Sequence, residues 1–310
     1  MQEKMLFVFN PYSGKGQIKN KLMEIVSIFS RAGFEIIIYP TRAAMDAYEK
    51  VSQSDGKYDC IVCSGGDGTL NEVISAVCRH RMSRPKIGYI PTGSTNDFAS
   101  TLGISKDMCR AACSIAAGAT MSVDIGKFNS RLFNYVAAFG LFTDISYKTP
   151  QNVKNVLGHQ AYILESLKSI SKIETYRMVI KNEEQIISGD FIYGMIANSE
   201  SIGGIKGVSG RQVLLNDGLF ETVFVREPKN PMDLQMIATG LITREEDNPM
   251  IERFKTDHIV IESDGPVSWT LDGENGGVHE RVEISVIPKA VDIIVPQKTL
   301  TANNKLRMAR

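Results

Sequence analysis

The sequence predicts a mixed α/β fold in two domains: an N-terminal domain built on a parallel sheet and a C-terminal antiparallel β-sandwich domain. The length of 310 residues is sufficient for two domains that each have a core. Up to about residue 121, short apolar runs alternate with segments in which apolar residues recur at helical spacing, which is typical of a parallel sheet covered by helices. Beyond it, alternating apolar segments separated by turn residues predict antiparallel strands.

The first domain is predicted to span residues 1–122. Apolar residues such as Ile18, Ile25 and Phe29 predict its first helix, and Gly33 is expected to end that helix. The expected parallel strands are 5–9, 34–39, 59–63 and 86–90. The expected helices are about 18–32, 43–51, 70–78 and, after Asp97, up to about 118.

The second domain is predicted to span residues 123–295, and the tail 296–310 is expected to pack back on the first domain. Only two helices are expected in it, at about 160–172 and 231–241. Its expected strands are 122–128, 176–181, 191–197, 219–225, 258–262, 282–287 and 291–295. The first of these strands begins at the boundary between the two predicted domains.

Composition excludes several classes of protein. Lys plus Arg (35) equals Asp plus Glu (35), so no net charge attracts the chain to nucleic acid, and no nucleic-acid partner is expected. No apolar run reaches the roughly 18 residues that span a bilayer, and the N-terminus lacks the features of a signal peptide. The odd number of cysteines, 5, favours a reducing compartment, and all are best explained as small core residues. A cytoplasmic protein is therefore expected.

The stretch 60–74 carries the most informative motif. A buried strand is expected to turn through Ser64-Gly-Gly-Asp-Gly-Thr69 into an amphipathic helix. Glycines let a backbone approach a polyphosphate closely, and the free N–H groups at a helix start face an anion. A carboxylate at Asp67 repels phosphate unless a cation lies between them, which predicts an arrangement of Asp67, water, Mg²⁺ and phosphate. The alternative is a tight turn in which Asp67 caps the helix.

Two further loops are expected at the same edge of the sheet. Residues 10–16 and 91–97, rich in Gly, Ser, Thr and Asn, also follow predicted parallel strands. Ligands of open α/β sheets bind at the carboxyl ends of the strands, so these loops predict a nucleotide triphosphate site and make the first domain a nucleotide-binding domain. The Walker A and dinucleotide fingerprints are both incomplete here.

The second domain contains two acidic turns. Asp217 precedes Gly218, and Asp272 and Glu274 flank Gly273. In an extended chain residues i and i+2 project the same way, so Asp272 and Glu274 could form a paired carboxylate site. The alternative is two hairpin turns without chemistry.

The motifs 10–16, 65–72, 91–99, 216–218 and 271–274 occur in a fixed order. Together they resemble the bacterial lipid kinases with a diacylglycerol kinase catalytic domain, which are related to sphingosine and ceramide kinases. The resemblance extends to about residue 297. It implies an α/β ATP-binding domain, a β-sandwich domain, and a cleft between them in which ATP phosphorylates a lipid hydroxyl.

The resemblance also implies site residues. Asp272 or Glu274 would be the general base, with Asp67 as a further catalytic acid. Asp217 would join Asp67 in a water-linked Mg²⁺ network that includes the main-chain oxygens of Leu214 and Leu219. The implied ATP-binding residues are Asn10, Pro11, Tyr12, Ser13, Gly14, Thr41, Gly66, Asp67, Gly68, Thr69, Leu70, Asn71, Glu72 and Ser94.

The sequence departs from the family pattern at three places. Residues 210–213 replace the usual Ala-Pro-x-Ala-like segment, Ser100 stands where Arg is common, and Ser94 replaces Thr but keeps the hydroxyl. The expected function is Mg²⁺-assisted transfer of the γ-phosphoryl group of ATP to a diacylglycerol-like acceptor, with transient contact at the inner face of the membrane. A homodimer is left open. The alternatives are a kinase of a soluble substrate, such as an NAD kinase, and a nucleotide-binding regulator without catalysis.

Two further expectations follow. Asp67→Ala and Asp272→Ala are each expected to leave folding intact and to lower turnover at least ~100-fold. Residues 139–142, 203–205 and the basic tail are candidate membrane contacts, although core packing and a solvated end are the favoured explanations.

Overall fold

The computed structural model describes residues 2–79, 84–141, 174–199, 201–202, 205–206, 213–243 and 247–308. The chain divides into two compact units. The first comprises Met1–Ile125, Leu214–Asp217 and Ile287–Arg310, and the second comprises Gly126–Val213 and Gly218–Val286. The predicted helix at 160–172 lies outside the described residues.

The first unit is built on a parallel sheet. Its strands β1 (Lys4–Phe9), β2 (Glu35–Pro40), β3 (Cys60–Gly65) and β4 (Lys86–Pro91) lie in the order β2-β1-β3-β4. The end of β15 (Glu274–Val295) adds a further parallel strand, with Ile293 opposite Ile87 of β4. These strands are almost continuously buried apart from the edge strand β2, as expected where helices cover both faces.

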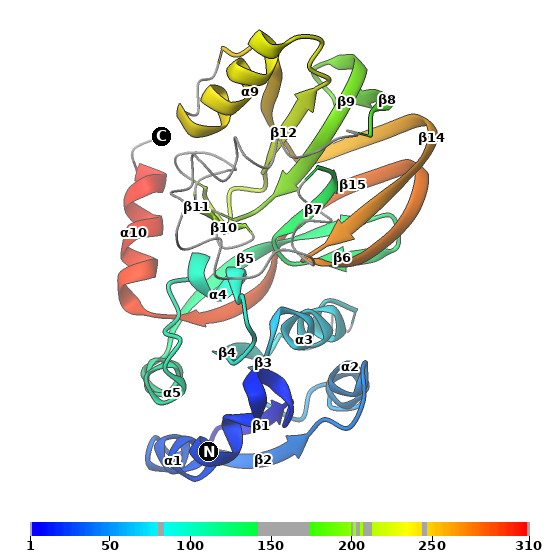
Figure 1. Ribbon diagram of the computed structural model, residues 1–310. Coiled ribbons are helices and arrows are strands. Elements are labelled where there is room, and N and C mark those ends of the chain that lie inside the picture. Colours follow the sequence, from blue (N-terminus) through cyan, green and yellow to red (C-terminus); the bar gives the residue numbers. More distant parts are fainter. Residues whose placement is uncertain are drawn as a thin grey trace. The chain divides into compact units, whose positions relative to one another are not determined.

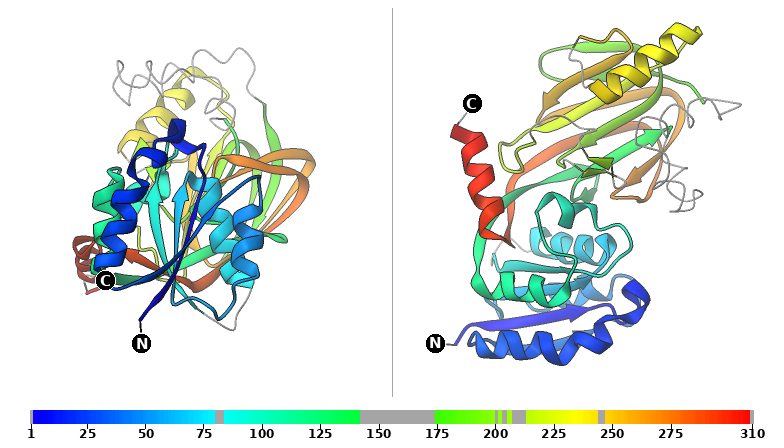
Figure 2. Two further views of the ribbon diagram at one scale, coloured as in Figure 1. Left: turned by 90° about the horizontal axis from the view of Figure 1, so that it is seen from below. Right: turned by 60° about the vertical axis from the view of Figure 1, so that its left-hand side comes forward.

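Helices cover the two faces of this sheet (Figures 1 and 2). The pair α1 (Ile18–Arg31) and α5 (Met108–Ala117) lies on one face, and the pair α2 (Asp46–Ser52) and α3 (Asp67–Arg79) lies on the other. Phe29 of α1 packs edge-on against Phe7 of β1, with ring centroids 6.0 Å apart. The short helix α4 (Asp97–Thr101) follows the loop after β4.

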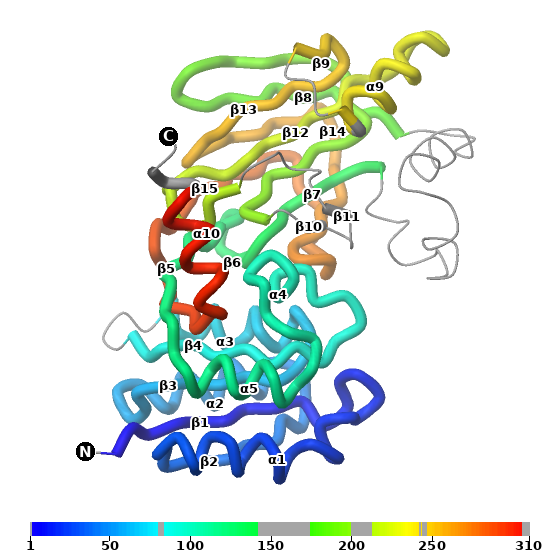
Figure 3. The backbone as a smooth tube through the Cα atoms, turned by 90° about the vertical axis from the view of Figure 1, so that its left-hand side faces the viewer, coloured from blue at the N-terminus to red at the C-terminus, as the bar shows by residue number. Residues whose placement is uncertain are grey.

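The C-terminal part of the chain completes the first unit. The strand β5 (Ala119–Phe128) pairs with β15, and the helix α10 (Gln297–Met308) follows β15 directly (Figure 3). Apart from the tail 296–310, which is expected to pack back on the first domain, each predicted domain is a continuous stretch of chain. The first compact unit also takes in Leu214–Asp217 and residues 287–295.

The second unit is dominated by antiparallel strands. They are β6 (Arg131–Phe133), β7 (Val136–Gly140), β8 (Tyr176–Lys181), β9 (Ile186–Ala197), β12 (Phe220–Arg226), β13 (Ile251–Thr256), β14 (His258–Leu271) and the first part of β15. A short hairpin, β10 (Ser201–Ile202) and β11 (Ile205–Lys206), and the helix α9 (Pro231–Thr243) complete the described elements. The sheet-dominated second part of the sequence is therefore confirmed.

Strand pairing in this unit closes on itself. Both β7 and β8 pair with β9 and with β14, so the strands surround one apolar core. Trp269 lies in that core, with its ring centroid 4.9 Å from that of Phe139 and 5.1 Å from that of Phe128. Phe139, a candidate membrane contact from the sequence, is fully buried and belongs to this core.

No helix in the described ranges combines the length and apolar character needed to cross a membrane.

Candidate functional site

Three loops of the first unit begin at the same edge of its sheet. They follow β1, β3 and β4, and hydrogen bonds continue the sheet into them. The N–H of Asn10 donates to the carbonyl of Ser64 (2.8 Å), and the N–H of Thr92 donates to the carbonyl of Gly65 (2.8 Å). We call residues 10–16, 65–69 and 91–96 the glycine corner.

Glycines allow the loops of the corner to touch through their backbones. A Cβ atom on Gly14 would lie 2.1 Å from the carbonyl oxygen of Thr92. A Cβ atom on Gly93 would lie 2.7 Å from the Cα atom of Gly66. Real Cβ contacts are not this short, so each of these two positions requires glycine for close approach. At Gly14 and Gly93 the corner therefore presents backbone, rather than side chains, at the carboxyl edge of the sheet.

Local hydrogen bonds fix the shape of two of the loops. The side-chain oxygen of Asn10 accepts from the N–H of Tyr12 (2.9 Å), and the backbone at Lys15 is left-handed, with φ 60°. Asn96 is also left-handed, with φ 55°. Its Oδ1 accepts from the N–H of Gly93 (3.0 Å), and its Nδ2 donates to the carbonyl of Gly93 (2.6 Å).

Tyr89 in β4 contacts both the loop after β4 and the end of β3. Its buried hydroxyl lies within hydrogen-bond distance of Oδ1 of Asn96 (3.2 Å) and of the carbonyl of Gly65 (3.3 Å). Burial, followed by the negative charge of Asp67, raises the pKa of Tyr89 well above its usual value. The hydroxyl therefore stays protonated and donates to these oxygens.

The corner has the properties of an anion site. The helix α3 begins at Asp67, so its first N–H groups lie in the corner, where the helix dipole favours negative charge. The hydroxyls of Ser64 and Thr92 are buried and have no hydrogen-bond partner in the described part of the chain. Backbone donors and close-packed glycines fit the phosphates of a nucleotide.

The Leu214–Asp217 segment belongs to the same unit as the corner. The carbonyl of Leu215 accepts from the N–H of Asp124 (2.8 Å), and Oδ1 of Asn216 accepts from Nδ2 of Asn303 (3.2 Å). Leu219 belongs to the second unit. Within the described ranges no cluster of three or more His, Cys, Asp or Glu side chains could hold a metal ion. A magnesium ion fits beside Asp67 and Asp217 only if water and phosphate supply most of its ligands, which is common for this ion.

Asp272 lies in the second unit, at the turn between β14 and β15. Leu271 pairs with Glu274, and the two residues between them have φ 52° (Asp272) and φ 83° (Gly273), which makes a two-residue turn of type I′. The chain reverses between Asp272 and Glu274, so the extended-chain rule that places residues i and i+2 on the same side does not hold for this pair.

The Asp272 carboxylate binds the backbone of the loop between β6 and β7. It accepts from the N–H groups of Asn134 (2.6 Å), Tyr135 (2.9 Å) and Val136 (3.1 Å). Asp272 is only 7% exposed, whereas Glu274 is exposed. The turn thus holds one buried, oriented carboxylate and one accessible carboxylate.

Comparison with known proteins places the chain in a family. A family model described as the diacylglycerol kinase catalytic domain matches residues 4–128. A diacylglycerol kinase from Staphylococcus saprophyticus is 32% identical over 280 residues, which cover 89% of this chain and 90% of the relative. The diacylglycerol kinase of Bacillus subtilis is 30% identical over 274 residues, which cover 87% and 89%. The chain belongs to the diacylglycerol kinase family.

Solved structures agree with this membership. A diacylglycerol kinase structure from Bacillus anthracis is 25% identical, with a TM-score of 0.77 over 96% of this chain and 98% of that one. A second B. anthracis structure, of a protein proposed to be a diacylglycerol kinase, is 26% identical and has a TM-score of 0.82 over 96% and 97%. The predicted family, fold class and kinase activity are confirmed, and a kinase implies ATP as a substrate.

In this diacylglycerol kinase family member, several predicted ATP-site residues lie in or beside the corner. Pro11, Tyr12 and Ser13 follow β1, and Ser94 is exposed in the loop after β4. Thr41 follows β2 at the same edge of the sheet, with its N–H donating to the carbonyl of Phe9 (2.9 Å). The α3 residues Gly68, Thr69 and Asn71 lie in the first turns of that helix.

Two other predicted ATP-site residues have structural contacts. Leu70 is fully buried, and its N–H donates to the carbonyl of Gly66 (3.2 Å). The carboxylate of Glu72 accepts from the N–H of Met45 (2.9 Å) and of Ala47 (3.2 Å), so it caps the start of α2.

Sequence reasoning missed two buried acids of the first unit. Asp124 is fully buried in β5, and its Oδ1 accepts from the N–H of Lys289 (2.6 Å). Asp97 is 3% exposed at the start of α4. The available signal for Asp124 was a single acid within the apolar run 123–125.

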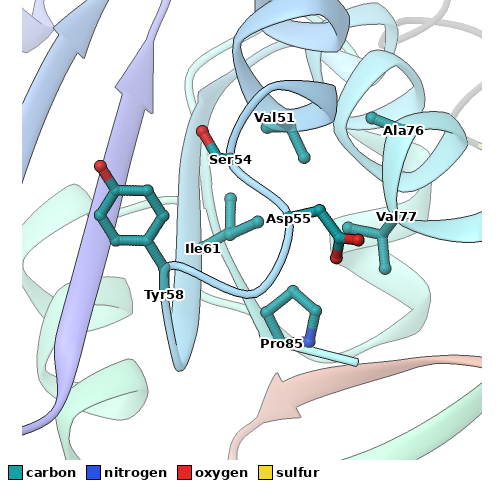
Figure 4. A pocket seen from close by; sticks show the side chains of 8 residues that line it. All are labelled: Val51, Ser54, Asp55, Tyr58, Ile61, Ala76, Val77 and Pro85. Carbon is teal, nitrogen blue, oxygen red and sulfur yellow. The ribbon is translucent and has the colours of Figure 1, made fainter. Parts of the chain in front are cut away.

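A pocket of the first unit lies away from the glycine corner (Figure 4). Ile61 near the start of β3 and Pro85 just before β4 place it at the amino-terminal edge of the sheet. Its lining residues are Val51, Ser54, Asp55, Tyr58, Ile61, Ala76, Val77 and Pro85. The pocket is therefore not part of the anion site.

Proposed function

We propose that this protein is an ATP-dependent lipid kinase that transfers the γ-phosphoryl group of ATP to the hydroxyl of a diacylglycerol-like acceptor. The observation that carries the proposal is the glycine corner, in which three loops touch through their backbones at the carboxyl edge of a parallel sheet. Family membership supports the lipid acceptor, because the curated relatives are diacylglycerol kinases.

The corner binds the phosphates of ATP. Backbone N–H groups at the start of α3 and in residues 14–16 donate to phosphate oxygens. Phosphoryl transfer needs in-line positioning and neutralised phosphate charge more than it needs covalent chemistry. A rigid backbone surface provides the positioning.

Asp67 and Asp217 are the acids of the first unit that would hold magnesium through water. When bound, the ion neutralises charge on the phosphate oxygens. Asp67 lies where α3 begins, so its carboxylate is close in sequence to the donors that bind phosphate.

The Asp272–Glu274 turn supplies the base. A lipid hydroxyl is a weak nucleophile, and a carboxylate within hydrogen-bond reach accepts its proton as it attacks. Asp272 is oriented by three backbone donors, and Glu274 is accessible to a hydroxyl. Because the lipid acceptor comes from a membrane, the proposal includes transient contact of the protein with that membrane. Formation of a homodimer stays a prediction.

The test is incubation of the purified protein with ATP, Mg²⁺ and a total lipid extract, followed by mass spectrometry of new phospholipids. A parallel reaction contains NAD in place of lipid. We expect an ATP-dependent phosphorylated lipid of the diacylglycerol class and no phosphorylated NAD. Phosphorylated NAD without a new phospholipid, or ATP binding without any product, would refute the lipid kinase assignment.

A further inference from the structure

The C-terminal helix α10 makes two contacts with distant parts of the first unit. The hydroxyl of Thr299 donates to the carbonyl of Leu102 (2.9 Å), at the end of α4. Nδ2 of Asn303 donates to Oδ1 of Asn216 (3.2 Å). Thr299 and Asn303 are four residues apart, so they lie on the same face of the helix.

The first contact is tightly fitted. A Cβ atom on Gly103 would lie 2.6 Å from the Thr299 hydroxyl, and Gly103 has φ 65°, a conformation that favours glycine. The start of α10 is therefore held against the segment that follows α4.

The second contact is buried on both sides. Asn303 is 7% exposed and Asn216 is 9% exposed. A buried amide that loses its partner is left with an unsatisfied polar group, so this pair favours one position of the turn. One residue earlier, the carbonyl of Leu215 accepts from the N–H of Asp124 in β5 (2.8 Å). The turn is thus held by β5 at Leu215 and by α10 at Asn216.

We propose that Asn303 is a positioning residue, through which α10 clamps the Asn216 turn and sets the position of Asp217. The residue after Asn216 is Asp217, the acid of the 216–218 motif, which lies in the first unit. This inference rests on the proposed function, because it gives Asp217 a role in phosphoryl transfer. It assigns a catalytic contribution to the C-terminal helix, which lies beyond all five sequence motifs.

The test uses two matched variants, Asn303→Leu and Asn304→Leu. Both change an asparagine of α10, but Asn304 is exposed. We expect Asn303→Leu to raise the amide hydrogen exchange of residues 213–218 at least ~10-fold by freeing the turn. We expect it to lower kcat about 10-fold, because small displacements of positioning groups are costly in phosphoryl transfer. Asn304→Leu should match the wild type in both measurements.

A second comparison separates positioning from general destabilisation. If Asn303 acts through Asp217, Asn303→Leu lowers kcat no further in an Asp217→Asn background. An equal loss of kcat in both backgrounds, or unchanged hydrogen exchange of residues 213–218 in Asn303→Leu, overturns the clamp. Wild-type kcat in Asp217→Asn alone instead overturns the proposed function of that acid. Asn303→Ser, a smaller change, replaces the leucine variant in every arm if that variant does not fold.

Discussion

Replacing Asp272 by alanine should destabilise the second unit as well as lower turnover. The sequence predicted that this variant folds normally, but the structure gives a different expectation. The carboxylate accepts three backbone N–H groups from the loop between β6 and β7, at 2.6, 2.9 and 3.1 Å. Alanine leaves those donors without their acceptor in a region where the acid itself is 7% exposed.

The size of the effect follows from these contacts. An unsatisfied buried donor costs about 1–3 kcal/mol, and three of them give roughly 3–6 kcal/mol once some solvent access is allowed. Alanine also tolerates φ 52° less well than Asp, at a cost of about 1 kcal/mol. For a unit of this size each kcal/mol lowers the Tm by about 2–4 °C, so the Tm should fall by on the order of 10 °C.

Asp272→Asn is the matched variant. The Oδ1 atom of the asparagine can still accept from the N–H groups of Tyr135 and Val136. Only at Asn134 would the Nδ2 group of the asparagine face another N–H donor. We expect the asparagine variant to lose about 1–3 kcal/mol, less than half of the alanine effect. Exposed Glu274→Gln should keep the wild-type Tm, so its kcat reports chemistry alone.

Differential scanning calorimetry measures the Tm of each variant, and kcat is then measured at a temperature where all of them are folded. If Asp272 is the base, both of its variants lose at least ~100-fold in kcat. An Asp272→Ala protein that melts within about 2 °C of the wild type would show that the carboxylate does not hold the loop.

The remaining predictions concern the first unit. Gly93→Ala should weaken ATP binding at least ~10-fold in calorimetric titration and lower the Tm, because its Cβ would lie 2.7 Å from Gly66; equal ATP affinity to the wild type would contradict close approach of the two loops. Glu72→Ala should lower the Tm by a few degrees, at about 1 kcal/mol for a lost cap of α2, with little change in kcat, and a large loss of kcat with an unchanged Tm would favour a direct role at ATP. Burial raises the pKa of the Cys60 thiol to about 12, so a thiol reagent at pH 8 should label exposed Cys113 and leave Cys60 unlabelled until the protein is denatured. Because the unfolded thiol ionises near pH 8.5 and folded Cys60 does not, the free energy of unfolding should fall as the pH rises from about 8.5 to about 12, and Cys60→Ala should reduce that fall.

The local pattern of the sequence predicted the parallel sheet and the glycine corner well. Strands that end in Gly-rich loops can be predicted from short-range information alone. The three loops meet because the carboxyl ends of parallel strands lie at one edge of the sheet. The contacts that define the corner depend on distant residues, so pattern alone could not show that Gly14 packs on Thr92 or that Glu72 caps α2.

Other features were missed because their signals are ambiguous. The strand β7 (Val136–Gly140) is almost fully buried and does not alternate, so period-2 reasoning did not detect it. The assignment of Leu214–Asp217 to the first unit depends on contacts with Asp124 and Asn303, which are distant in sequence. For Asp272 the sequence left two alternative interpretations open, and the structure shows a hairpin turn whose acid also binds a neighbouring loop.

The use of β15 to finish the first sheet has a consequence for synthesis on the ribosome. The strand that pairs with β4 through Ile293 is made only after the whole intervening antiparallel unit. Domains usually fold as they emerge, N-terminal first. Here the N-terminal unit must wait with an open sheet edge until the intervening antiparallel unit has been translated, so nascent chains stalled before residue 287 should expose that edge to chaperones or to one another.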